Sequence, residues 1–167
     1  NGHGLVVADG AIADFDGASV AMARNVAVVV DGAGARLRAR RLAVSATLAD
    51  PAGNLGYGLE AGGGARVDLE RALFAHNRDV GVSVLGAKTI VSFHDVAVLS
   101  TQPTQSGTCG RAVQVGIGAA LRWGGGRIEG GGQAGLGHDG QARRVGAREA
   151  AFAARAAVVE PRQRDQR

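Results

Sequence analysis

The stretch that decides the fold is RNVAVVVDGA at residues 24–33, which returns as RDVGVSVLGA at residues 78–87. In both copies valine occupies every second position of the central run, which indicates a β-strand rather than a helix. A glycine follows each run at the same place, as expected of a corner that needs a positive φ.

These glycines belong to a longer series in which a short and a long interval alternate: Gly10, Gly32, Gly64, Gly86, Gly118 and Gly140. At the fifth position after each glycine stands an apolar residue, in the order Phe15, Leu37, Leu69, Val91, Trp123 and Val145. At the tenth position the series is Val20, Leu42, Phe74, Val96, Ile128 and Ala150. A period in this range predicts a solenoid, in which each coil buries its apolar face only against its neighbours.

Three short strands joined by tight corners fill a coil of about 22 residues. The sequence therefore predicts an all-β, right-handed parallel β-helix of about six coils, with a 10-residue insertion after every second coil. A leucine-rich repeat would need a recurring Leu-x-x-Leu-x-Leu motif, and a helical repeat would need apolar spacings of three and four. We expect a single domain at residues 1–155, built from repeats at 2–55, 56–109 and 110–159, and a flexible polar tail at 160–167.

Residues 147–159 allow two descriptions. The repeat predicts a strand of the sixth coil up to about Phe152, whereas their alanine content favours a helix that could cap the open end. The chain also opens at Asn1 in the middle of a repeat, so we expect a piece of a longer β-helix, whose open coil ends would allow end-to-end self-association.

A motif runs through the repeats. Its first copy reads Gly-x-Gly-Leu-x-Val at 2–7, Asp-Gly-Ala at 9–11 and Arg-Asn-Val at 24–26. A second copy stands at 56–59, 63–65 and 78–82. A third, degraded copy stands at 110–113, 118–119 and 133–135. This pattern resembles the right-handed parallel β-helix repeat proteins of bacteria, in the pectate-lyase-like fold superfamily. The resemblance implies an exported, often surface-attached protein without a definite activity. Enzymes of that superfamily use acidic calcium sites with a nearby Arg or Lys, or clustered Asp residues, and neither arrangement matches here residue by residue.

The chain is basic, with 19 Lys and Arg against 15 Asp and Glu, and Lys88 is its only lysine. The arginines at 36, 38, 40 and 41 form a cluster that suggests nucleic-acid binding. The repeat columns place Asp14 and Asp68 beside Arg36, and Asp16 and Glu70 beside Arg38, while Asp95, Arg127 and Glu149 share a further column. Because opposite charges then stack on adjacent coils, we expect salt-bridged ladders and disfavour nucleic acid as a partner.

The acidic pairs Asp14 with Asp16 and Asp68 with Glu70 could perform glycoside chemistry, but each faces arginines. The four histidines fall in different columns: His3 in a loop, His76 in an apolar column, His94 facing outward and His138 at a strand end. No zinc pattern links them to Cys109 or to a carboxylate. The glycine runs at 124–126 and 130–132 lack the Gly-Lys-Ser/Thr of a phosphate loop. We therefore predict no catalytic, metal-binding or cofactor-binding residues and no cofactor.

The insertions at 48–57 and 102–111 fall at the same place in two repeats, so we expect them to project from one side and offer the best binding surface. No segment approaches the roughly 20 apolar residues of a membrane span. The favoured function is a non-catalytic extracellular or surface module, structural or binding a carbohydrate or a protein. The alternative is a fragment of a polysaccharide lyase or glycoside hydrolase of the β-helix class.

Overall fold

Parallel strands form the framework of the fold. The computed structural model describes residues 2–107, 110–129 and 136–139, and every strand pair within them is parallel. The first sheet has the order β1-β3-β5-β8-β11-β14. Its strands are β1 (Leu5–Ala8), β3 (Val26–Asp31), β5 (Tyr57–Ala61), β8 (Val80–Val84), β11 (Arg111–Gly116) and β14 (Leu136–Asp139).

The second sheet bends into two arms. Its strands are β2 (Ile12–Ala21), β4 (Arg36–Ser45), β6 (Arg66–Glu70), β7 (Leu73–Ala75), β9 (Ile90–His94), β10 (Val96–Leu99), β12 (Ala120–Trp123) and β13 (Gly126–Glu129). The first arm holds β6, β9, β12 and the first halves of β2 and β4, and the second arm holds β7, β10, β13 and the second halves. A residue with positive φ stands at the bend in every described coil: Gly17, Arg41, Arg71, Asp95 and Gly125.

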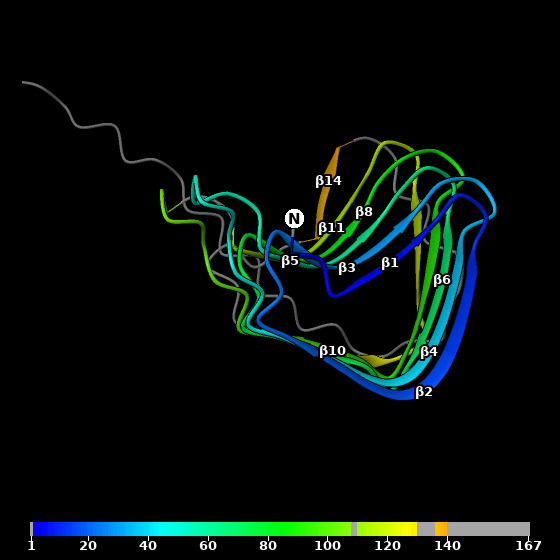
Figure 1. The fold of residues 1–167 in the computed structure, drawn as a ribbon. Coiled ribbons are helices and arrows are strands. Elements are labelled where there is room, and N and C mark those ends of the chain that lie inside the picture. Colours follow the sequence, from blue (N-terminus) through cyan, green and yellow to red (C-terminus); the bar gives the residue numbers. More distant parts are fainter. Residues whose placement is uncertain (1, 108–109, 130–135, 140–167) are drawn as a thin grey trace, which may run out of the picture.

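The coils stack along one axis, so that the same strand of each turn lies beside its equivalent in the next (Figure 1). The all-β architecture and the parallel β-solenoid are confirmed, with about five turns and a match to the right-handed parallel β-helix. The sixth predicted coil is described only by its first strand, β14, which pairs with β11. The rest of that coil, both descriptions of residues 147–159 and the predicted tail at 160–167 lie outside the described residues.

The length of the two-coil repeat is confirmed, but its predicted division at the glycines is wrong. In the first sheet the register partners of Val28 are Leu5 in the coil before and Leu59 in the coil after. Their separation in sequence is one residue longer than the short glycine interval on the first side, and one residue shorter than the long glycine interval on the second. In the second sheet Arg36 lies between Ile12 and Arg66, and the discrepancy grows to two residues. Successive coils therefore differ in the length of the corner between the two sheets.

The two corners have different backbone conformations. After β1 the turn has positive φ at two consecutive residues, Asp9 and Gly10, and the Ala11 N–H donates to Ala8 O at 2.9 Å. After β3 the positive φ values fall on Gly32 and Gly34, with Ala33 between them, so this corner is one residue longer. The first pattern returns at Gly63-Gly64 and Ile117-Gly118, and the second at Gly86 and Lys88.

The predicted inward stack of Phe15, Leu37, Leu69, Val91 and Trp123 is corrected by this register. Two stacks exist instead: Ala13, Leu37, Val67, Val91 and Leu121, and beside it Phe15, Ala39, Leu69, Phe93 and Trp123. The second predicted column separates likewise, into Val20, Val44, Phe74, Val98 and Ile128, with Leu42 and Val96 in a neighbouring position.

The core is narrow and aliphatic. Its largest fully buried side chains are those of two phenylalanines, Phe74 and Phe93, among leucines and valines. Phe93 meets the edge of Trp123 in the next coil, with ring centroids 5.3 Å apart and an interplanar angle of 67°. Because a solenoid coil contacts only its neighbours, each such contact ties two coils together.

We expect Gly64→Ala to lower the free energy of unfolding by about 1–2 kcal/mol, the cost of a left-handed conformation for an L-residue. Gly64 has a φ of 87°, and an added Cβ would meet nothing closer than 3.9 Å, so backbone strain and not collision sets the cost. Gly86, with the same φ, should respond alike. Urea denaturation measures the loss. Gly64→Asn is the matched control, because asparagine tolerates this conformation better, and an Asn variant no more stable than the Ala variant would contradict the reasoning.

Candidate functional site

The outer face of the first arm carries a dense group of charged side chains. Three rows run across the coils at the strand spacing of about 4.8 Å. The rows are Ile12, Arg36, Arg66, Ile90 and Ala120; Asp14, Arg38, Asp68, Ser92 and Arg122; and Asp16, Arg40, Glu70, His94 and Gly124. Buried Leu37, Ala39, Val67 and Leu69 alternate with these residues along β4 and β6, which fixes the charged side chains on the outside.

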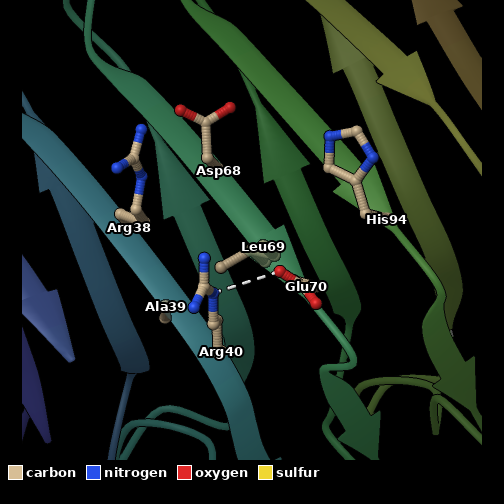
Figure 2. Close-up of a pocket in the computed structure, with 7 residues that line it drawn as sticks. All are labelled: Arg38, Ala39, Arg40, Asp68, Leu69, Glu70 and His94. Atoms are coloured by element: carbon tan, nitrogen blue, oxygen red, sulfur yellow. Dashed lines mark ion pairs between the residues drawn. The ribbon is translucent and has the colours of Figure 1, made fainter. Parts of the chain in front are cut away.

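An open hollow of about 350 Å³ lies on this face between β4, β6 and β9 (Figure 2). Its wall combines two arginines, Arg38 and Arg40, with the acids Asp68 and Glu70 and with His94. Figure 2 shows Arg40 reaching across to Glu70, while Arg38 and Asp68 stand side by side at the other end. The hollow is therefore a polar, mixed-charge surface floored by Ala39 and Leu69.

Two arginines hold the carboxylate of Glu70. Arg40 Nε lies 3.1 Å from Glu70 Oε2, and Arg71 Nη2 lies 3.2 Å from Oε1. On the neighbouring coils Arg41 Nη2 lies 2.9 Å from Asp16 Oδ1. These side chains are about half exposed, so each ion pair contributes at most about 1 kcal/mol.

Opposite charges stack on adjacent coils as predicted, but the partners are shifted by two residues, and among the described residues Arg38 forms no ion pair with Asp14 or Asp68. Arg38, not Arg36, lies between Asp14 and Asp68, and Arg40, not Arg38, lies between Asp16 and Glu70. The predicted column of Asp95, Arg127 and Glu149 is also wrong for its first two residues. Arg127 lies opposite Ala97, not Asp95, and forms an ion pair with Glu129 of its own strand. Glu149 lies outside the described residues.

The two insertions leave the solenoid on the same side and lie next to each other, as predicted (Figure 1, left). Gly53 of the first is buried against Gln105 of the second, where an added Cβ would lie 2.7 Å from Gln105 Oε1. Thr104 and Ser106 share a hydrogen bond of 2.9 Å within the second insertion. The insertions therefore form one two-layered ledge, although residues 108–109, Cys109 among them, lie outside the described part.

The base of each insertion is held by one residue in the left-handed conformation. Asn25, with a φ of 72°, donates its N–H to Leu48 O and accepts from the N–H groups of Gly56 and Tyr57. Asp79, with a φ of 61°, makes the same three bonds with Gln102, Gly110 and Arg111. Asn and Asp tolerate this conformation, which explains the Arg-Asn and Arg-Asp motif of the repeats.

The arginine of that motif reaches into the insertion itself. Arg24 Nη1 donates to Ala49 O at 3.0 Å, and Arg78 Nη1 donates to Pro103 O at 3.3 Å. These two arginines therefore have a structural role, because each one fixes the backbone of an insertion through a hydrogen bond.

The histidines do not gather. His3 lies in a loop with Nδ1 2.9 Å from Val26 O, His94 faces outward in the hollow, and His138 lies within β14. The prediction for His76 is wrong, because this residue is exposed at a corner with a φ of 55°. Among the described residues no three His, Cys, Asp or Glu side chains form a group that could hold a metal ion. The glycines at 125 and 126 have positive φ at the bend between β12 and β13, as a corner requires.

The titration of Glu60 on β5 is clearly displaced. Burial raises the pKa of its carboxyl, nearby Asp31 raises it further, and His3 lowers it in part. The folded protein thus holds this proton more tightly than the unfolded chain. Stability must fall as the pH rises from the ordinary glutamate pKa of about 4.3 through the folded-state value, and stay lower at neutral pH.

We therefore expect Glu60→Gln to stabilise the protein at pH 7.5 relative to wild type and to leave it nearly unchanged at pH 4. Thermal unfolding of both proteins at the two pH values measures the difference. Glu129→Gln serves as an exposed control and should show no gain at pH 7.5. A Glu60→Gln effect of equal size at both pH values would contradict the assignment.

Comparison of the chain with protein-family models, curated proteins and solved structures returned no match. None of the described segments forms a helix that is long and apolar enough to cross a membrane.

Proposed function

We propose that the chain is a non-catalytic β-solenoid module of the extracellular space or the bacterial cell surface, with a structural or binding role toward a carbohydrate or a protein. The repeat motif and its resemblance to bacterial β-helix repeat proteins of the pectate-lyase-like superfamily support this placement. Its binding surfaces are the charged face of the first arm and the ledge formed by the two insertions.

The main observation behind the proposal is that two arginines contact the carboxylate of Glu70. An acidic pair on a β-helix face is the feature that would favour a polysaccharide-cleaving enzyme. Here the carboxylate best placed in the hollow has one arginine on each oxygen, and Asp16 of the other acidic pair is held by Arg41. Carboxylates held in such ion pairs stabilise the stacking of the coils, and they are poorly placed to act as a general acid or to attack a sugar.

A polysaccharide array scored for both binding and cleavage tests the proposal. We expect retention of at least one polysaccharide without release of reducing ends or of unsaturated products. Cleavage that is lost in Glu70→Gln but kept in Glu129→Gln would overturn the proposal in favour of the enzyme alternative. End-to-end association through the coil ends stays a separate prediction, which sedimentation at several protein concentrations can measure.

A further inference from the structure

Two arginines on neighbouring coils lie directly opposite each other. Arg36 on β4 and Arg66 on β6 are register partners, and both side chains are exposed. The residues that follow them, Leu37 and Val67, are each 1% exposed, so the arginines must point away from the core. Like charges placed opposite each other on adjacent strands destabilise a sheet. The arrangement therefore calls for a compensating anion.

No carboxylate of the described residues forms an ion pair with either of the two arginines. The ion pairs on these strands use Arg40, Arg41 and Arg71, and within the described part of the chain neither Arg36 nor Arg66 takes part in one. Along their own row the pair is flanked by Ile12 and Ile90. The nearest acidic row belongs to Asp14 and Asp68, which stand on either side of Arg38.

We propose that Arg36 and Arg66 together bind a tetrahedral oxyanion, the sulfate ester or phosphate monoester of a glycan ligand. This rests on the proposed binding function and specifies its ligand. A guanidinium presents a planar fork of donors, and one fork can satisfy both oxygens of a carboxylate. Two forks side by side match a group with three terminal oxygens, such as a phosphate monoester. Isoleucines beside the pair offer apolar surface to the rest of the sugar.

Nucleic acid is the competing polyanion, and the face suits it less well. Binding of single strands relies on exposed aromatic side chains for stacking as well as on cations. The exposed large hydrophobic residues of the described chain are all aliphatic or methionine: Val6, Ile12, Met22, Leu48, Leu73 and Ile117.

Thermal unfolding in sulfate or phosphate, compared with chloride at equal ionic strength, tests the anion site without a glycan. Sulfate stabilises most proteins by exclusion from their surface, so only the difference between variants counts. We expect the wild type to gain more than Arg66→Gln, whereas Arg122→Gln, which removes an exposed arginine elsewhere on the same face, should keep the full gain. Equal gains in all three proteins would overturn the anion site.

Binding to immobilised polymers then identifies the ligand. The probes are dextran sulfate, a phosphorylated mannan, polygalacturonate, neutral dextran and single-stranded DNA. Arg66→Gln should weaken binding to the sulfated or phosphorylated polymer about tenfold, the value of one charge-assisted hydrogen-bonded contact, and Arg122→Gln should not. Which of the two polymers binds separates the two sources of the oxyanion.

The outcomes separate the two proposals. Binding to polygalacturonate or DNA alone, independent of Arg66, would overturn this inference and leave a binding module. An Arg66-dependent response to sulfate without binding to any polymer would keep the anion site and refute the glycan as its ligand.

Discussion

Leu69→Asp should abolish cooperative folding of the solenoid. Leu69 is 0% exposed on β6 and packs in the stack between Ala39 and Phe93 of the adjacent coils. The substitution removes a buried leucine and places a carboxylate where no cation can reach it, so the cost should exceed about 4 kcal/mol. That loss approaches the whole stability of an ordinary domain, about 5–15 kcal/mol.

The control lies in the same coil. Leu73 on β7 is 38% exposed, so Leu73→Asp puts the same change of side chain at the surface. We expect a loss of about 1 kcal/mol or less for it. Thermal unfolding followed by circular dichroism compares both with wild type. Similar melting temperatures for the two variants would refute the burial of Leu69.

The period and the strands could be predicted because they depend on alternation within each coil. The valine runs at 26–30 and 80–84 identify strands of the first sheet directly. The pairing between coils could not be predicted as securely. A shift of one residue would turn every side chain to the other face, but a shift of two keeps the apolar residues inside. The apolar pattern of the sequence therefore allows Phe15 to lie opposite either Leu37 or Ala39, and in the structure its partner is Ala39.

The corners explain the shift. Gly10 is the second of two consecutive residues with positive φ, whereas Gly32 is the first residue of a longer corner. Both positions need glycine for the same conformational reason, so they look equivalent in the sequence. Aligning them misplaces the following strands of the second sheet by two residues.

The same shift concealed the candidate anion site. The acids of β2 and β6 face outward because they flank Phe15 and Leu69, whose side chains point into the core. The wrong register set Asp68 opposite Arg36, which made Arg36 look neutralised. The true partner of Arg36 is Arg66, and the like-charged pair emerges only from the strand pairing.

Nothing in the sequence indicated a buried amide at the corner between β7 and β8, next to the corner that leads into the first insertion. Asn77 is 1% exposed. Its Oδ1 accepts from the Thr47 hydroxyl at 2.8 Å and from the Thr47 N–H at 3.2 Å, and Nδ2 donates to Val44 O at 3.5 Å. Asparagine is usually exposed, so its type alone does not indicate burial. The residues that correspond to Asn77 on the neighbouring coils are Thr47 and Thr101, so no asparagine recurs at this position of the repeat.

We expect Asn77→Ala to lower the free energy of unfolding by about 2–4 kcal/mol. The change leaves two buried donors of Thr47 without an acceptor, and each unsatisfied group costs about 1–3 kcal/mol. Because Thr47 directly precedes the first insertion, the loss should also loosen that loop. Urea denaturation gives the stability, and amide exchange at residues 47–49 gives the local effect.

Two further variants show whether the hydrogen bonds are the cause. Thr47→Val removes the hydroxyl donor, so in the Asn77→Ala background it should cost less than it does alone. Asn54→Ala changes an exposed asparagine in the insertion and should have little effect. If Asn77→Ala unfolds like Asn54→Ala, or if the two substitutions at 47 and 77 are additive, the amide does not hold the corner through Thr47.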